Sequence, residues 1–359
     1  MGKIKVAIVG IGNCASSLVQ GIEFYKSIDE QSGFIPGIMH NKIGDYTVGD
    51  IEFVAAFDIN KKKVGKKLSE AIFTEPNCAK KFTDVLSGNV KVQKGPVLDG
   101  LGGKLENIIP IDSNQKEVNV AEILKIANAE ILINFLPTGS FIATKFYAEQ
   151  AILANCGFIN AIPEPIASNH QWAEKFSRVN LPLAGDDIKS QIGATILHRT
   201  LIDLFNKRGG KIVKTTQINS GGNTDFLNLM EKPLRSHTKD FTKKNAIRSL
   251  IPYDDASIEV EINYKEGMGD TKECLIKTEG VIFGSTPILI EARLLVDDSP
   301  NSAGVMVDVI RGMKIAIDNK EGGPLSDLCG YYFKSPPIPY NDDIAHEKII
   351  KMFTSDVII

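Results

Sequence analysis

The sequence lacks a long hydrophobic run, an excess of charge of one sign and any closely paired cysteines. A helix that crosses a bilayer needs about 20 apolar residues in a row, so we expect no membrane partner. Lysine and arginine number 41 against 44 aspartate and glutamate residues, which argues against a broad basic surface for nucleic acid. The opening residues, MGKIKVAIVG, pass at once into a strand and a glycine loop, a pattern unlike that of a signal peptide.

The five cysteines stand far apart in the sequence, without a CxxC pair. This spacing favours neither a disulfide framework nor a thiolate zinc site. We therefore expect reduced thiols and a cytoplasmic location. The cysteines are Cys14, Cys78, Cys156, Cys274 and Cys329.

The N-terminal residues carry the strongest local signal. An apolar run, KIKVAIV (3–9), leads into Gly10-Ile11-Gly12-Asn13-Cys14-Ala15 and then into a segment with helical apolar spacing. This is the G-x-G-x-x-A variant of the dinucleotide fingerprint, whose glycines let a diphosphate approach the backbone at a helix N-terminus. An ordinary glycine-rich turn is the alternative, but the strand before it and the helix after it favour the dinucleotide site.

The acid that would bind the ribose of the cofactor lies further along than usual. The fingerprint places it about 20 residues after the glycines, whereas the candidate here is Asp58, at the end of the strand IEFVAAFD (51–58). We interpret the polar, glycine-rich residues between them as an insertion after the first helix. A carboxylate at this position favours NAD over its 2′-phosphorylated form.

Apolar strands continue to alternate with helices up to about residue 200. We expect strands over 130–137, 157–163 and 181–187, and a basic amphipathic helix over 61–73. This alternation predicts an α/β fold with a Rossmann-like, doubly wound parallel sheet. Ligands on such sheets bind beyond the carboxyl ends of the strands, where the sequence places Thr138, Gly139, Asn160 and Asp187.

The stretch AGDDIKSQIGATIL (184–197) places several polar groups in front of a helix expected over 190–208. Ser190 would serve as an N-cap, and a plain cap is the alternative to a ligand site. Gly193 costs about 1 kcal/mol relative to alanine in a first helical turn, unless a ligand approaches the backbone there. Free amides, the hydroxyls and Lys189 would suit a phosphate, so we predict a second anion site beside the nicotinamide.

After Gly210 the pattern changes to an α+β layer with a large, mostly antiparallel sheet that would suit an oligomer interface. Its strands are expected over 211–223, 272–284 and 287–298. An apolar helix over 302–320 is expected to return to the first domain. The predicted parts are an NAD-binding domain at 1–200, a catalytic and oligomerisation domain at 201–298, and a C-terminal segment at 299–359.

Polar residues stand at the ends of elements throughout this second half. Each lysine taken alone is more typical of a solvated surface, and Asp298 alone would suit a helix cap. Their joint position suggests a site but does not identify the reaction. The residues are Asn223, Asp225, Lys239, Lys243, Lys272, Asp298 and Lys334.

Five motifs make the chain closely similar to the myo-inositol-1-phosphate synthase family, in its shorter bacterial and archaeal form. The resemblance spans nearly the whole sequence. It implies a Rossmann domain completed by the C-terminal segment, a central sheet domain that builds a homotetramer, and tightly held NAD. The motifs are VAIVGIGNCASSLVQGIEFY, GDDIKSQIGAT, NSGGNTDFLN, DSPNSAGV and KSPP.

The reaction that the resemblance implies converts glucose 6-phosphate to inositol 1-phosphate without net redox change. NAD+ oxidises C5, the new ketone acidifies the C6 protons, the C6 enolate closes the ring on C1, and C5 is reduced again. Lysines would stabilise negative charge that develops on oxygen in a site poor in water. A lysine beside other cations has a lowered pKa and can act as a base.

The strand-end positions and the resemblance together give three sets of site residues. The catalytic set is Lys239, Lys243, Lys272, Lys334, Asp187, Asp225 and Asp298, with Lys272 expected at the C5 proton and Lys239 or Lys243 at the C1 oxygen. The cofactor set is Gly10, Gly12, Asn13, Cys14, Ala15, Asp58, Pro137, Thr138, Gly139, Asn160, Asp187 and Asp298. The substrate-phosphate set is Lys189, Ser190, Gly193, Ala194, Thr195 and Asn223.

A metal requirement stays open at this stage. Members of the family differ in using a divalent metal, a monovalent cation or neither, so the resemblance does not decide it. Asp187, Asp225 and Asp298 are candidate ligands for Mg, Mn or Zn. The five histidines show no ligand spacing, and His198 is expected to pack within its helix.

Two other functions stay open as alternatives. An NAD-dependent dehydrogenase of another phosphorylated or aldehyde substrate would share the two-domain plan but would release NADH. A dinucleotide-sensing binding protein would share the first domain, but it would not need lysines at so many element ends. Fold analogy alone would not separate these functions.

Overall fold

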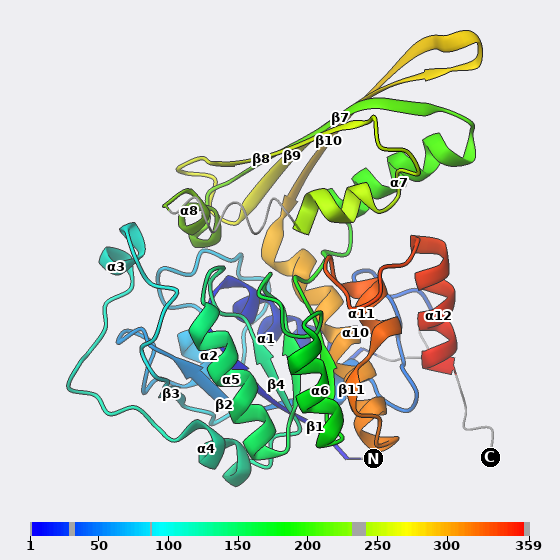
Figure 1. Cartoon of the computed structure of the whole chain (residues 1–359). Coiled ribbons are helices and arrows are strands. Elements are labelled where there is room, and N and C mark those ends of the chain that lie inside the picture. Colours follow the sequence, from blue (N-terminus) through cyan, green and yellow to red (C-terminus); the bar gives the residue numbers. More distant parts are fainter. Residues whose placement is uncertain (1, 29–32, 87, 232–241, 355–359) are drawn as a thin grey trace.

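The computed structural model describes residues 2–28, 33–86, 88–231 and 242–354, which form two sheets (Figure 1). The larger sheet has seven strands in the order β11-β6-β5-β4-β1-β2-β3, and every neighbouring pair is parallel. The predicted doubly wound parallel sheet is confirmed. Its strands are β1 (Ile4–Val9), β2 (Ile51–Asp58), β3 (Val92–Lys94), β4 (Ile131–Asn134), β5 (Gly157–Asn160), β6 (Pro182–Ala184) and β11 (Gly323–Pro324).

Both faces of this sheet are covered, which explains why its strands read as continuous apolar runs. Alternate residues of β1 enter different cores: Ile4, Val6 and Ile8 pack into one, and Ala7 and Val9 into the other. The first core is closed by α1 (Asn13–Tyr25), α10 (Asp298–Asp318), α11 (Ser326–Tyr332) and α12 (Asp342–Thr354). The second is closed by α4 (Val120–Ile126), α5 (Phe141–Ala154) and α6 (His170–Arg178).

Short elements complete this part of the chain. A 3-10 turn at Val48–Asp50 precedes β2, and two short helices, α2 (Leu68–Ala71) and α3 (Lys104–Ile108), stand before and after β3 in the sequence. Within the described ranges, every helix is too short or too polar to span a bilayer.

The second sheet lies above the first in Figure 1 and has the order β10-β9-β7-β8. It is mostly antiparallel, as predicted, because β9 runs against both β7 and β10, while β7 and β8 are parallel. A 3-10 turn at Phe283–Ser285 joins β9 to β10. The strands are β7 (Lys211–Gly221), β8 (Ser257–Tyr264), β9 (Thr271–Ile282) and β10 (Thr286–Asp297).

Helix α7 (Ala194–Lys207) covers one face of the second sheet, and α8 (Thr224–Glu231) follows β7 at its lower edge in Figure 1. Leu197 and Leu201 of α7 pack against Cys274 and Ile276 of β9. The opposite face of the sheet therefore stays exposed in a single chain.

The end of the chain returns to the parallel sheet. Helix α10 starts directly after β10 and packs along α1, with Met306, Val309, Ile310 and Met313 in the first core. β11 then pairs with β6, so residues from the end of the chain supply an edge strand of the N-terminal sheet.

Two predicted helices are wrong in extent. The basic segment 61–73 is helical only at Leu68–Ala71, because Asn60 accepts the N–H of Lys62 on its side chain and closes a turn instead. The helix expected from Ser190 begins at Ala194, with Gly193 as its N-cap. Asn301 explains this difference: its backbone and side-chain oxygens accept the N–H groups of residues 191 and 192, which holds that turn outside the helix.

Candidate active site

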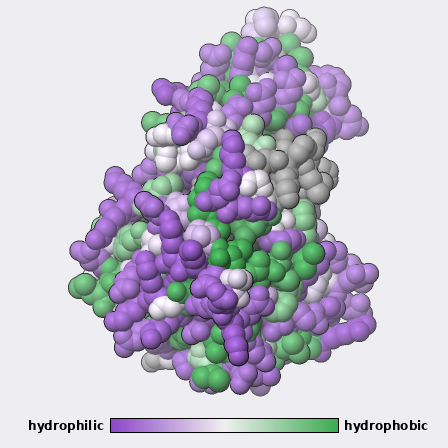
Figure 2. Space-filling view, turned by 90° about the vertical axis from the view of Figure 1, so that its left-hand side faces the viewer, coloured by the Kyte–Doolittle hydropathy of each residue, from purple (hydrophilic) through white to green (hydrophobic). Residues whose placement is uncertain are grey.

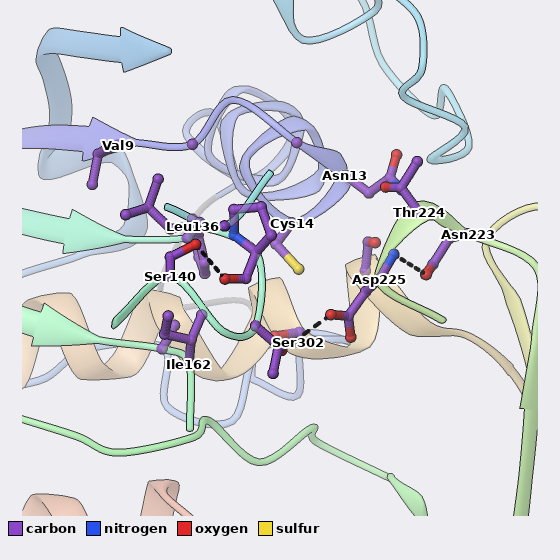
Figure 3. Close-up of a pocket in the computed structure, with 18 of the residues that line it drawn as sticks. Val9, Asn13, Cys14, Leu136, Ser140, Ile162, Asn223, Thr224, Asp225 and Ser302 are labelled. Atoms are coloured by element: carbon purple, nitrogen blue, oxygen red, sulfur yellow. Dashed lines mark hydrogen bonds between the residues drawn. The ribbon is translucent and has the colours of Figure 1, made fainter. Parts of the chain in front are cut away.

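One cavity collects most of the predicted site residues where the two sheets meet. It lies beyond the carboxyl ends of β1, β2 and β4, as expected for a doubly wound sheet. Figure 3 shows Val9, Leu136 and Ser140 toward one end of the space, and Asn223, Thr224 and Asp225 toward the other. The predicted residues that line it are Gly10, Gly12, Asn13, Cys14, Asp58, Pro137, Thr138, Asp187, Ser190, Gly193, Ala194, Thr195, Asn223, Asp225, Lys243, Lys272, Asp298 and Lys334.

The cavity combines polar residues with an apolar lobe. The loop after β3 adds Leu98 and Leu101, and α3 and the residue that follows it add Leu105 and Ile109. The side view in Figure 2 shows hydrophobic residues gathered at mid-height, where the two parts of the molecule meet, amid a mostly hydrophilic surface. Such a pocket, apolar with a few convergent polar groups, suits an organic cofactor.

The glycine loop follows β1 and is fixed by Asp58. One carboxylate oxygen of Asp58 accepts the N–H of Ile11 at 2.8 Å, and the other accepts the N–H groups of Ile59 and Asn60. A Cβ on Gly12 would meet no heavy atom within 4 Å, so this side of the loop is open to a ligand. The loop and its acid therefore fit a dinucleotide.

Two residues of this region were missed by sequence reasoning. Lys63 is 3% exposed, lines the cavity and donates to the carbonyl oxygen of Ile11 and to Asn77, at 2.7 and 2.8 Å. Asn77 donates to the same carbonyl at 3.0 Å. Nothing in the sequence distinguishes Lys63 from the other lysines of its basic segment.

The turn before α7 presents backbone donors to the cavity. The first hydrogen bond of the helix joins the N–H of Leu197 to the carbonyl of Gly193. The N–H groups of residues 194–196 therefore have no acceptor within the helix. Ser190, Gly193, Ala194 and Thr195 line the cavity here. An anion placed at this turn would meet these amides and the positive end of the helix dipole.

Two lysine–aspartate pairs lie at the same cavity. Lys272 at the start of β9 contacts Asp298 at 2.9 Å, and Lys334 contacts Asp187 at 2.7 Å. The side chains of the two lysines are 13% and 12% exposed, so each charge is largely withdrawn from water and compensated by its partner. Thr242 also donates to Asp187, at 2.6 Å.

Asp270, a third residue that sequence reasoning missed, holds several predicted residues together. Its carboxylate accepts from the side chain of Asn223 and from both the hydroxyl and the N–H of Ser299. Its backbone carbonyl accepts the N–H of Asp298. Burial, with the nearby Asp298 charge adding to it, raises the pKa of Asp270 to about 6. Asn223 in turn accepts the N–H of Asp225 at the start of α8.

Four predicted residues lie elsewhere. Lys189 donates to the carbonyl oxygens of Gly330 and Tyr331, both at 3.0 Å, and lines a neighbouring cavity; burial, with Arg199 nearby, lowers its pKa to about 7. Asn160 donates to the carboxylate of Asp186 at 2.8 Å inside the sheet. Ala15 packs in the core, and Gly139 is not part of the cavity wall. Lys239 lies outside the described residues.

The three candidate metal ligands are not gathered into one site. Asp187 pairs with Lys334, Asp298 with Lys272, and Asp225 accepts from Thr138 at 3.2 Å. Across the part of the chain that the structure describes, no three His, Cys, Asp or Glu side chains form a metal-binding group. These residues do not fit a divalent ion, and we derive no step through a metal.

The buried His198 of α7, the helix that follows the turn at 190–195, makes the stability of the fold depend on pH. Burial lowers its pKa from 6.5 to about 4, while it bonds Gln217 and Thr215. As the pH falls through this range, the unfolded chain takes up a proton that the native state does not. The free energy of unfolding should therefore lose about 3 kcal/mol between about pH 6.5 and pH 4, and keep this contribution at higher pH.

Urea unfolding of wild type and His198→Gln at several pH values measures this difference. The glutamine variant should lack that part of the pH dependence. His346→Gln, at an exposed histidine of α12, is the matched control and should follow wild type. Parallel pH profiles for wild type and His198→Gln would contradict the assignment.

Comparison with known proteins adds a separate line of observation. Residues 193–299 match the family model for myo-inositol-1-phosphate synthase. The chain is 45% identical over 354 residues to inositol-3-phosphate synthase of Corynebacterium glutamicum, covering 96% of this chain and 97% of that protein. It is 46% identical over 350 residues to inositol-3-phosphate synthase of Mycobacterium tuberculosis, covering 97% and 95%. A solved myo-inositol-1-phosphate synthase-related protein of Thermotoga maritima superimposes with a TM-score of 0.79 at 26% identity, covering 97% of each chain.

Proposed function

Since the chain belongs to the myo-inositol-1-phosphate synthase family and is an inositol-3-phosphate synthase, an NAD-dependent isomerase, we propose that its cavity cyclises D-glucose 6-phosphate. The product is 1L-myo-inositol 1-phosphate. The observation that carries this proposal is the makeup of one cavity. The glycine loop, the turn before α7 and lysines from four distant segments all line it.

The glycine loop and Asp58 are the residues that would hold NAD, with Thr138 and Cys14 on the same wall. NAD bound there would supply the hydride acceptor for C5 and, after ring closure, the hydride donor. The turn at 190–195 holds the substrate phosphate through its amides and hydroxyls. Lys189 plays no part in that contact, because its ammonium group is held by carbonyl oxygens in the neighbouring cavity.

Proton transfer at C5 falls to Lys272. Oxidation of C5 requires its hydroxyl proton to leave together with the hydride. Lys272, after passing a proton to Asp298 at 2.9 Å, accepts the hydroxyl proton and gives it back when C5 is reduced. The pairing with Asp298 thus supplies both a proton store and a fixed position for the amine.

The remaining lysines act on charge that develops during ring closure. Lys243 is 4% exposed and lines the cavity, and in this proposal it stabilises the oxygen on C1 as that carbon is attacked. Lys334 holds Asp187 against the substrate side of the crevice. Lys239, proposed for the same role as Lys243, lies outside the described residues.

The exposed face of the second sheet supports a homotetramer as part of this proposal. Leu275, Leu289 and Leu295 point away from α7 and are 44%, 53% and 60% exposed. They alternate with charged residues such as Lys277 and Glu291 on the same face. A face of this kind buries its apolar side chains when copies of the chain pair.

A redox balance separates this function from that of an ordinary dehydrogenase. With glucose 6-phosphate in large excess over NAD, inositol phosphate should accumulate far beyond the amount of NAD, with no net rise in NADH absorbance. The hydride returns to the same substrate in each turnover, so NAD is not consumed. An assay specific for inositol phosphate measures the product, and NADH absorbance in the same reaction measures the redox balance. Formation of one NADH per substrate consumed, without inositol phosphate, would identify a dehydrogenase instead.

A further inference from the structure

Both backbone polar groups of Ile11, in the glycine loop, are hydrogen-bonded to side chains. Asp58 accepts its N–H at 2.8 Å. Lys63 and Asn77 donate to its carbonyl oxygen at 2.7 and 3.0 Å. The residue between the two fingerprint glycines therefore has no freedom to rotate toward an incoming ligand.

The two residues after Asn77, Cys78 and Ala79, are hydrogen-bonded to Asn13 in the glycine loop. The side-chain oxygen of Asn13 accepts the N–H groups of Cys78 and Ala79, at 2.7 and 3.1 Å. Lys63 links the segment 77–79 to the glycine loop, because its ammonium group contacts both Asn77 and Ile11. The fingerprint loop is thus clamped by a segment more than 60 residues away in sequence.

This clamp changes the charge that the loop presents. The N–H of Ile11, one of the donors that such a turn offers to a diphosphate, is already taken by a carboxylate. A diphosphate approaching this loop would meet the negative charge of Asp58 as well as the remaining amides. A cation beside the loop is needed to offset that repulsion.

Lys63 is placed to be that cation. It is 3% exposed and lines the cavity. An ammonium group has three N–H donors, and two of them have acceptors among the described residues. Burial lowers the pKa of Lys63, and the nearby Asp58 charge offsets only part of that effect.

We propose that Lys63 binds the diphosphate of the dinucleotide, with its third N–H directed to that group, and positions the glycine loop through Ile11. This inference rests on the proposed binding of NAD in this cavity. In a typical fingerprint loop, backbone amides bind the diphosphate. Here a lysine outside the fingerprint would bind it as well.

Binding of cofactor fragments tests the assignment without recourse to activity. Titration calorimetry of protein stripped of bound NAD compares wild type with Lys63→Met, Lys63→Arg and Lys62→Met as each binds adenosine, ADP and NAD. Loss of a hydrogen bond to a charged group predicts ADP and NAD affinities about tenfold to hundredfold weaker in Lys63→Met, with adenosine affinity unchanged. Lys63→Arg should keep most of the ADP affinity. Lys62→Met, at a neighbouring side chain that is 47% exposed, is the matched control and should bind as wild type does.

Two results would overturn the proposal. Equal losses for adenosine and ADP would mean that Lys63 only shapes the loop, and unchanged ADP affinity would mean that it has no role in binding. If Lys63→Met does not fold, Lys63→Gln, which keeps a donor for Ile11 but no charge, takes its place. Failure of wild type to bind NAD would count against the proposed function itself, which keeps the two outcomes apart.

Discussion

Lys272→Ala should lower the turnover of glucose 6-phosphate by about a thousandfold while leaving bound NAD in place. The alanine removes the amine that is 2.9 Å from Asp298 and lines the cavity. Lys272 belongs to β9 of the second sheet, whereas the glycine loop follows β1 of the first sheet, so we expect cofactor binding to persist without it. Inositol phosphate formation and NAD content of the purified variant measure the two effects separately.

Lys207→Ala is the matched control for this experiment. Lys207 ends α7, which packs on the same sheet, and its side chain is 54% exposed and paired with Asp203 and Asp343. Its loss should leave turnover close to wild type. Normal turnover of Lys272→Ala would remove Lys272 from the reaction, and equal losses in both variants would point to a general loss of stability rather than to a defect of the site.

Gly10→Ala should abolish NAD binding and destabilise the fold by at least about 2 kcal/mol. Gly10 has φ of +85°, a conformation that side chains other than glycine rarely adopt. A Cβ there would lie 2.5 Å from the carbonyl oxygen of Phe135 and 2.7 Å from its carbon. Because these are backbone atoms after β4, relief would require β1 and the β4 loop to separate. Urea unfolding and calorimetric titration with NAD measure both losses.

Gly12→Ala should separate cofactor binding from folding. A Cβ on Gly12 meets no heavy atom within 4 Å, so stability should stay near that of wild type. The methyl group would nevertheless occupy the open side of the loop, so NAD affinity should fall by about tenfold or more. Gly21→Ala, inside α1 with nothing within 4 Å, is the control and should slightly stabilise the protein without affecting NAD. Full NAD affinity in Gly12→Ala would show that the cofactor does not approach this loop.

The parallel half of the fold could be predicted because its signals are local. Each central strand is a short apolar run buried on both faces, and polar turn residues follow it. This pattern located β1, β2 and β4 and the position of Asp58 at the end of β2. The antiparallel pair of β9 and β10 was also predicted from a local signal, two strand-like segments joined by Ser-Thr.

What the sequence could not give depends on contacts between distant residues. Ser190 has the chemistry of an N-cap, but Asn301, more than 100 residues away, decides that α7 starts at Ala194. Lys189 stands beside Ser190 in sequence, yet the carbonyl groups of α11 draw its side chain into another cavity. In sequence, Lys63 resembles the surface lysines around it. It differs from them only in the structure, where its ammonium group donates to Ile11 and Asn77.

The return of α10 and β11 to the N-terminal sheet governs how the chain can fold during synthesis. A ribosome releases β1 to β6 well before residues 298–324, which close one side of that sheet and add its edge strand. Until α10 emerges, Ile4, Val6 and Ile8 have α1 beside them but lack the C-terminal helices of their core. A nascent or prematurely terminated chain would thus expose an apolar, aggregation-prone surface. It would depend on chaperones for longer than a chain in which each sheet strand is followed directly by the helix that covers it.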